Sequence, residues 1–376
     1  TDLDTLHDIT IVGAGPSGLA CAIVLARGGR RVLVREWKPD VGHRFHDDFQ
    51  GLENWTRDDD VLDELASAGI TVDFEHHGFM TGTVFDPSGR RHEVQGKRPL
   101  FYLLRRGSAE GTLDRALLNQ AIAAGVEVRF NDRVREFSGA GVLAAGPRQA
   151  GIIAAGHLFE TDMPDGAWLA LGHAVAPGGY AYLLVQGGRG TVASCMFTGF
   201  RDQAKHVAAA VAFFRAHTDL VMRNPRPFAG YGNMRLPVSA MQGGHPVIGE
   251  LAGFGMRHAI RSGVLAAQSS LDGDDYTARW RAELGPWLKS GIVNRLVFNA
   301  AGEPGMKLAV GRLARFDAGG LLKRAYGPSA LKNLLLPLAQ RWYHAPLADP
   351  SCNHIDCNCV WCQHGDHAEM SKLNTV

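Results

Sequence analysis

The chain has 376 residues, of which 45% are hydrophobic and 20% are charged, and its formal net charge is +1. Such a composition is typical of a globular protein long enough to form two domains. The nearly balanced charge argues against a nucleic-acid-binding protein, which needs a basic surface. Because no apolar run reaches the roughly 18 residues of a membrane span, and no signal peptide is visible, we expect a soluble cytoplasmic protein.

The first predicted elements form a dinucleotide-binding motif. A buried strand at 9–12 precedes a G-x-G-x-x-G turn, and an apolar helix over 19–26 leads to a second strand that ends near Glu36. In this motif the glycines allow a tight turn, the approach of a pyrophosphate and close helix packing, while the acid accepts hydrogen bonds from ribose hydroxyls. We predict that FAD or NAD, rather than NADP, is bound by Gly13, Gly15, Pro16, Ser17, Gly18 and Glu36.

A polar stretch at 37–55, rich in His, Asp and Gly, follows the second strand. We expect a long loop there, because this composition suits neither a regular helix nor a buried strand. Loops at the carboxyl ends of parallel strands hold ligands. Arg44 is therefore a candidate contact for the cofactor's phosphates or ring edge, with an ordinary solvated arginine as the alternative.

The next part of the chain alternates between two kinds of strand pattern. The predicted elements are helices at 59–68 and 112–124, an antiparallel hairpin at 81–94, and strands at 71–74, 100–106, 126–130 and 141–146. We expect the strand at 126–130 to rejoin the parallel sheet. Two strand ends supply further cofactor-binding candidates, Arg106 and Gly146.

From residue 166 onward the architecture changes. Alternating apolar and polar residues over 166–200 predict antiparallel sheet, and a helix is expected at 207–217. The segment 246–255 is expected to return to the cofactor, followed by a helix at 257–269. The pattern from 272 to about 344 is helical and is broken by glycines and prolines.

Four segments make the chain resemble the geranylgeranyl-reductase-like branch of the p-hydroxybenzoate-hydroxylase superfamily of FAD-dependent oxidoreductases. They are the N-terminal glycine motif, Pro-Gly-Gly-Tyr-Ala-Tyr at 177–182, Ile-Gly-Glu-Leu-Ala-Gly-Phe at 248–254 with the helix after it, and Tyr-x-x-x-Trp at 276–280. The resemblance implies that FAD is the cofactor and that Gly249, Glu250 and Gly253 also bind it. Glu250 departs from the family's usual aspartate, by one methylene group. Tyr180 and Tyr182 become the candidate catalytic residues beside the flavin.

The resemblance also implies the fold class. We expect an α/β protein with a Rossmann-like FAD-binding domain, an inserted antiparallel-sheet substrate domain, a helical C-terminal region and a Cys/His-rich tail. The predicted boundaries are 1–75, 105–156 and 235–271 for the FAD-binding domain, 76–104 and 157–234 for the substrate domain, 272–346 for the helical region, and 347–376 for the tail.

Within this family several chemistries remain open. The first hypothesis is the reduction or desaturation of an apolar or polyunsaturated small molecule. The second is monooxygenation of a ring-containing metabolite, and the third is electron transfer without an organic substrate. Because no second nicotinamide-binding motif is present, a reductase needs electrons from transiently bound NAD(P)H, a ferredoxin-like donor or a cluster of its own.

The C-terminal tail has the density of a metal site, with four cysteines and three histidines between 352 and 367. The metal-ligand candidates are Cys352, Cys357, Cys359 and Cys362. Four thiolates suit an iron–sulfur cluster, and thiolates with imidazoles suit zinc. Their spacing matches no standard zinc finger, so redox-active thiols and a tail without metal stay open.

A last segment, 331–343, is apolar with a basic flank. It is typical of a helix packed against the catalytic body, of a helix resting on a membrane surface, or of a helix lining a lipid-sized cavity. We therefore keep peripheral membrane contact as a possible partner interaction, beside an apolar small-molecule substrate.

Overall fold

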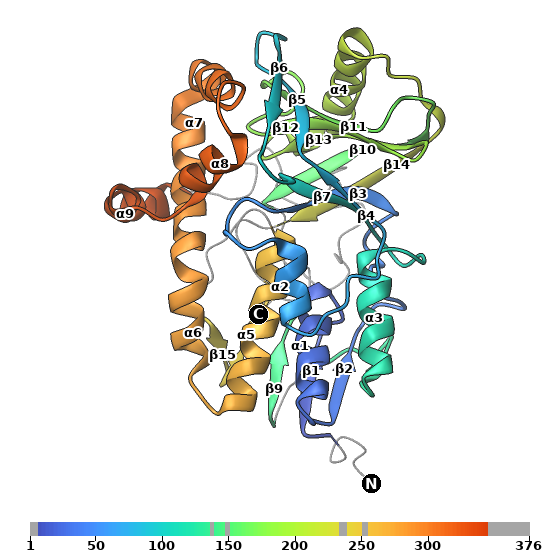
Figure 1. Ribbon diagram of the computed structural model, residues 1–376, viewed down its shortest axis with the longest axis vertical. Coiled ribbons are helices and arrows are strands. Elements are labelled where there is room, and N and C mark those ends of the chain that lie inside the picture. The colour runs from blue at the N-terminus through green and yellow to red at the C-terminus, as the bar shows by residue number, and fades with distance from the viewer. Residues whose placement is uncertain (1–6, 136–138, 147–150, 233–238, 250–254, 345–376) are drawn as a thin grey trace, which may run out of the picture.

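The computed structural model describes residues 7–135, 139–146, 151–232, 239–249 and 255–344. Figure 1 shows a parallel sheet with its helices at one end of the molecule and a larger, mostly antiparallel sheet at the other. A long helix, α7 (Gly285–Leu313), runs along one side of both.

The parallel sheet has the strand order β8-β2-β1-β9, and all neighbouring strands run in the same direction. The strands are β1 (Ile9–Val12), β2 (Val32–Arg35), β8 (Glu127–Arg129) and β9 (Gly141–Leu143). The helices packed around it are α1 (Pro16–Arg27), α2 (Val61–Ser67), α3 (Leu113–Ala123) and α5 (Gly255–Asp272). This is the Rossmann arrangement, in which a ligand binds at the carboxyl ends of the central strands.

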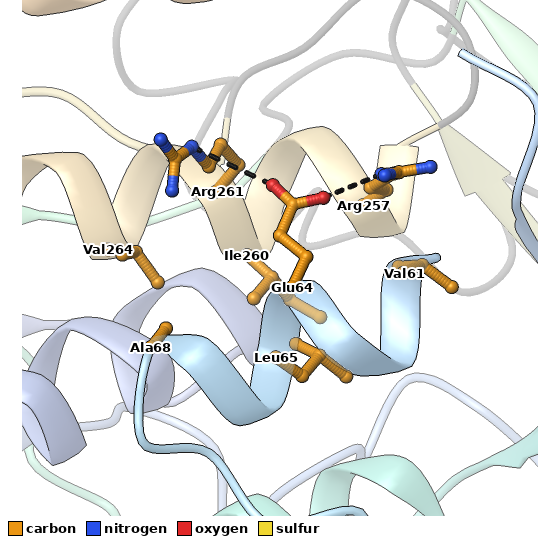
Figure 2. Close-up of a pocket in the computed structure, with 8 residues that line it drawn as sticks. All are labelled: Val61, Glu64, Leu65, Ala68, Arg257, Ile260, Arg261 and Val264. Carbon is orange, nitrogen blue, oxygen red and sulfur yellow. Dashed lines mark hydrogen bonds and ion pairs between the residues drawn. The ribbon is translucent and has the colours of Figure 1, made fainter. Parts of the chain in front are cut away.

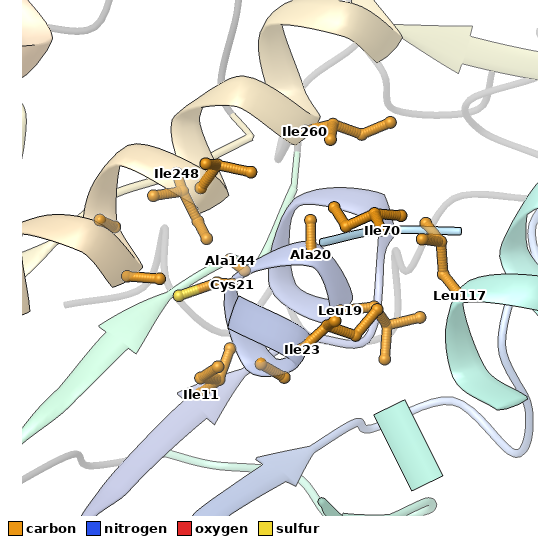
Figure 3. Packing of buried hydrophobic residues seen from close by; sticks show 14 of the residues in the cluster. Ile11, Leu19, Ala20, Cys21, Ile23, Ile70, Leu117, Ala144, Ile248 and Ile260 are labelled. Carbon is orange, nitrogen blue, oxygen red and sulfur yellow. The ribbon is translucent and has the colours of Figure 1, made fainter. Parts of the chain in front are cut away.

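The core of this end is formed by apolar side chains of the sheet and of the helices around α1. Figure 3 shows Leu19 and Ile23 of α1 between Ile11 of the sheet and Leu117 of α3, with Ile260 of α5 nearby. All five are buried. Helix α1 is apolar over most of its surface because it has neighbours on several sides.

A seven-stranded sheet has the order β14-β10-β13-β12-β11-β5-β6. Its strands are β5 (Thr81–Phe85), β6 (Arg91–Gln95), β10 (Ile152–Glu160), β11 (Gly166–Leu171), β12 (Tyr180–Gln186), β13 (Arg189–Met196) and β14 (Arg223–Gly232). Of the neighbours among these strands, only β11 and β5 run parallel. Helix α4 (Gln203–His217), preceded by a 3-10 turn at Phe200–Asp202, covers one face. A short pair, β15 (Met241–Gln242) and β16 (His245–Pro246), precedes α5.

A third, three-stranded sheet lies between the other two (Figure 1). It consists of β3 (Asp48–Glu53), β7 (Phe101–Arg106) and β4 (His76–Phe79), all antiparallel. The prediction that 37–55 is entirely loop was wrong, because β3 pairs with β7 along its whole length. Phe49 and Leu52 are buried in that strand, and the polar residues around them hide its apolar positions.

The C-terminal region is helical as predicted, with α6 (Tyr276–Glu283), α7, α8 (Ala318–Tyr326) and α9 (Ala330–His344). Helix α7 is broken at Gly302, whose φ of 55° and ψ of −162° interrupt the helical backbone. No helix in the described parts of the chain is long and apolar enough to cross a membrane.

Several of the other predicted elements are confirmed and one is wrong. The hairpin at 81–94, the return of 126–130 to the parallel sheet and the helices after 207 and 257 are confirmed. The strand predicted at 71–74 is wrong, since the chain has no regular structure there and the next strand begins at His76. The domain boundaries stay a prediction; β10 extends across one of them.

Candidate functional site

The glycine turn between β1 and α1 leaves room for a ligand at one position only. Gly13 has a φ of +111°, and a Cβ there would lie 2.3 Å from the carbonyl oxygen of Ala144. A Cβ on Gly18 would lie 2.1 Å from the carbonyl oxygen of Gly13. A Cβ on Gly15 would meet nothing within 4 Å. Gly13 and Gly18 are therefore required by the fold, whereas the packing of the fold places no such demand on Gly15.

The acid at the end of the second strand is held beside this turn. One carboxylate oxygen of Glu36 accepts from the backbone N–H of Ala14 at 2.7 Å, and the other accepts from that of Lys38 at 2.9 Å. Glu36 is half-buried. Its carboxylate is thus fixed at the carboxyl edge of the parallel sheet, where it has lone pairs left to accept from ribose hydroxyls.

A second segment approaches the same turn through α5. The amide of Gly249 donates to the hydroxyl of Ser262 at 3.0 Å, and a Cβ on Gly249 would lie 2.5 Å from the hydroxyl oxygen of Ser17. A Cβ on Gly263 would lie 2.1 Å from the carbonyl oxygen of Ser17. The small residues of α1 and α5 therefore let the two helices cross closely, which brings Gly249 to the start of α1. Glu250 and Gly253 lie outside the described residues.

Gly146 follows β9, the strand that runs beside β1. It has a φ of +74°, and a Cβ there would meet nothing within 4 Å. The strand before it also supplies Ala144, which packs against the glycine turn. Gly146 therefore lies two residues after Ala144, which contacts the glycine turn between β1 and α1 directly.

The two candidate arginines, Arg44 and Arg106, share the aromatic ring of Phe45 as a neighbour. Their guanidinium groups lie 4.9 Å and 4.1 Å from its centroid. Arg44 donates to the carbonyl oxygen of Tyr231 at 2.9 Å, and burial lowers the pKa of its guanidinium. Arg106 makes a bidentate ion pair with Asp114, at 2.7 and 2.8 Å. Neither residue is a solvated loop arginine, and Arg106 already has a full carboxylate partner.

Tyr180 and Tyr182 lie on the face of the seven-stranded sheet opposite α4. Alternation along β12 sends Ala181 and Leu183 into the core beneath α4 and the two tyrosines to the other side. Their rings are 6.3 Å apart, and both side chains are half-buried. Tyr182 packs with Phe228 of β14 and other apolar residues, so the surroundings are largely apolar.

The two phenols are held in their protonated form. The phenol of Tyr180 donates a hydrogen bond to the neighbouring Cys195 side chain. The charge of Cys195 and burial together raise the pKa of Tyr180 well above its usual value. Burial and the charge of Asp48 raise the pKa of Tyr182 in the same way. At neutral pH both groups can therefore donate a hydrogen bond or a proton, and neither can act as a phenolate base.

The sequence analysis missed two residues beside these tyrosines, Arg295 of α7 and Tyr326 of α8. The guanidinium of Arg295 lies 3.5 Å from the ring centroid of Phe197. Burial raises the pKa of Cys195 to about 11, and the positive charge of Arg295 acts in the opposite direction. Burial raises the pKa of Tyr326 to about 12. No local motif marks either residue, because they reach the site only through the packing of the C-terminal helices.

Figure 2 shows a cavity between α2 and α5, where Glu64 bridges Arg257 at 2.8 Å and Arg261 at 3.7 Å. Its volume is about 10 Å³, which is room for one water molecule. It therefore holds no organic ligand. In the described parts of the chain no group of three or more His, Cys, Asp or Glu side chains is placed to hold a metal ion. The four candidate cysteine ligands lie outside those parts.

Comparison with known proteins agrees with the parallel-sheet domain. A family model described as an NAD(P)-binding Rossmann-like domain matches residues 11–83. Thiamine thiazole synthase from Pyrococcus horikoshii is 33% identical over 72 residues, which are 19% of this chain and 29% of that protein. The chain thus spans less than a third of that relative's length.

Solved structures match much more of the chain. A geranylgeranyl bacteriochlorophyll reductase-like protein from Thermoplasma acidophilum has a TM-score of 0.66 at 17% identity, over 88% of this chain and 99% of that chain. A flavin-dependent brominase has a TM-score of 0.58 at 16% identity, over 90% and 99%. The structure of 2-methyl-3-hydroxypyridine-5-carboxylic acid oxygenase has a TM-score of 0.52 at 13% identity, over 83% of this chain and 97% of that chain.

These similarities define the fold. The chain has the overall fold of these three solved structures. Of the three, the geranylgeranyl bacteriochlorophyll reductase-like structure has the highest TM-score, so the resemblance drawn from the sequence motifs is confirmed at the level of the fold. The neighbours include both reductase-like and oxygenating proteins.

Proposed function

We propose that this protein is a FAD-dependent oxidoreductase that reduces or desaturates an apolar or polyunsaturated small molecule. The observation that carries the proposal is the opening at Gly15, where a Cβ would meet no atom within 4 Å. Glu36 lies beside this opening. The face of the seven-stranded sheet that carries Tyr180 and Tyr182 is the proposed place for the substrate. An unobstructed backbone at the start of α1, next to a fixed carboxylate, fits the pyrophosphate and ribose of FAD.

The chain's own residues fit this cofactor in three places. The N–H groups at the start of α1 would hold the pyrophosphate, the Glu36 carboxylate would hold the ribose, and the backbone around Gly249 would approach from the second side. When bound, FAD supplies two-electron chemistry, and the protein supplies position and electrostatics. Arg44 is a further candidate contact, since none of the described carboxylates lies at bonding distance from its buried guanidinium, and an anion beside it would offset that burial.

The surroundings of the tyrosines support an apolar substrate. Leu158, Ala193 and Phe228 form a buried cluster against Tyr182. An apolar molecule loses no hydrogen bonds on entering such surroundings, whereas a polar one would. A protonated phenol at Tyr180 would donate to a polar atom of the substrate or deliver a proton to the carbon being reduced.

The distinguishing test is the reaction of the reduced flavin with oxygen. For a reductase we expect photoreduced, substrate-free enzyme to reoxidise slowly in air and rapidly on addition of an isoprenoid alkene. Oxygen uptake dependent on NAD(P)H with a hydroxylated product would instead establish the monooxygenase, whose fold the oxygenase neighbour shares.

For Tyr180 we expect the Phe variant to lower turnover about 100-fold while the flavin spectrum stays unchanged, because a donated proton is lost. Below about pH 10 the turnover of the parent enzyme should show no pH dependence that arises from ionisation of this phenol. Tyr276→Phe is the matched control, since it also removes a buried hydroxyl, one that donates to the carbonyl oxygen of Val247 at 3.0 Å. Equal turnover in parent and Tyr180→Phe would remove Tyr180 from the catalytic role.

Electrons would come from NAD(P)H, a ferredoxin-like donor or a metal cluster in the tail. We expect anaerobically purified protein to contain about one zinc, or about two to four irons with matching sulfide. Cys359→Ser with Cys362→Ser should abolish this metal, whereas Cys21→Ala, a buried free cysteine of α1, should not. Metal analysis that finds neither element rejects both the cluster and the zinc.

A further inference from the structure

The segment 304–344, from the end of α7 through α9, combines exposed apolar side chains with a strong excess of cations. Six of the eleven large hydrophobic side chains exposed in the described parts of the chain lie within residues 304–344: Leu308, Phe316, Leu331, Leu334, Leu338 and Trp342. The same 41 residues contain seven Lys and Arg and a single acid, Asp317. Their net charge is therefore +6, while that of the whole chain is +1.

Helix α9 has two apolar faces. Leu335, Leu336 and Ala339 pack against Ile292 and Val293 of α7. The second face carries Leu331, Leu334, Leu338 and Trp342, spaced by three or four residues, and its leucines are 57–76% exposed. Among the described residues, packing against α7 involves only the first of these faces. Figure 1 shows α9 at the outer edge of the molecule, beyond α7.

The cations adjoin this second face. Arg341 follows Leu338 by three residues and Leu334 by seven, so it borders the apolar stripe. Arg312, Arg315 and Arg324, from the end of α7 and from α8, are also exposed. The single acid is already used, because Asp317 caps α8 by accepting from the amide of Gly320 at 3.1 Å.

We propose that α8, α9 and the end of α7 form a docking surface for an anionic phospholipid bilayer. Exposed leucines and a tryptophan would enter the headgroup boundary, and the arginines around them would contact lipid phosphates. The charge selects this partner, because an apolar stripe inside a +6 segment complements an anionic surface and repels a second copy of itself. Helices α7 and α8 also carry Arg295 and Tyr326 beside Tyr180, so the proposed surface is continuous with the helices that reach the tyrosines.

The test is flotation of the full chain with vesicles on a density gradient. We expect the protein to float with phosphatidylcholine–phosphatidylglycerol vesicles, to float much less with phosphatidylcholine alone, and to be released by salt. The variant carrying Leu334→Glu and Leu338→Glu should lose about tenfold or more in vesicle partition. Ile122→Glu is the matched control, a 54% exposed apolar residue of α3 outside this segment, and should float like the parent.

A second variant separates charge from apolar contact. Arg315→Gln, Arg324→Gln and Arg341→Gln together should lower binding to the anionic vesicles about tenfold or more and leave binding to neutral vesicles unchanged. The proposal is overturned if the full chain does not float. That result is expected if residues 345–376 cover the stripe. The proposal is also overturned if the leucine variant floats unchanged, or if it alters only the oligomeric state. None of these outcomes depends on FAD.

Discussion

Gly15→Val should give a folded protein that purifies without colour. The valine side chain finds no protein atom near its Cβ, so the fold tolerates it, but it fills the space proposed for the pyrophosphate. We expect FAD affinity to fall at least about 100-fold, which corresponds to about 3 kcal/mol of binding free energy. Titration of the apoprotein with FAD, followed by flavin fluorescence, measures this loss.

Gly311→Val provides the matched control for that experiment. A Cβ at Gly311 likewise meets no atom within 4 Å, and the residue lies in α7, away from the parallel sheet. Its variant should purify yellow with the affinity of the parent. If the Gly15 variant also keeps its flavin, the N-terminal turn is not the FAD site and the proposed function loses its basis.

The Asp114→Ala variant should lose about 3–5 kcal/mol of its free energy of unfolding. The side chains of Arg106 and Asp114 are 6% and 1% exposed, and the substitution leaves the buried guanidinium without its bidentate partner. The carboxylate also accepts from the amide of Gly107 at 3.1 Å, so a second buried donor is left unpaired. Urea unfolding followed by circular dichroism, with and without saturating FAD, measures the change.

An exposed pair of the same chemistry serves as the control. Arg223 and Asp162 also form a bidentate pair, but their side chains are 46% and 84% exposed. Asp162→Ala should cost less than about 1 kcal/mol. A loss confined to the FAD-loaded form of Asp114→Ala would show that the Arg106 pair serves the cofactor rather than the fold.

The elements found correctly from the sequence are those whose signal is local. The glycine turn is predicted by the spacing of Gly13, Gly15 and Gly18 between a strand and a helix, which is a local pattern, even though the tight contact of Gly13 is with the distant Ala144. Strand β3 was missed for the opposite reason. Its partner, β7, lies about 50 residues further along the chain, and the register of Phe49 on Arg105 is set by that pairing.

The candidate site divides in the same way. The sequence by itself determined the dinucleotide turn, the acid beside it and the alternation that puts Tyr180 and Tyr182 on one face, since each depends on spacing within one element or between consecutive elements. Tertiary structure decided what surrounds them. Only the folded chain pairs Arg106 with Asp114, brings Arg295 and Tyr326 to the tyrosines, and leaves one face of α9 exposed. These contacts join segments up to about 150 residues apart, and no local pattern encodes a neighbour that packing alone selects.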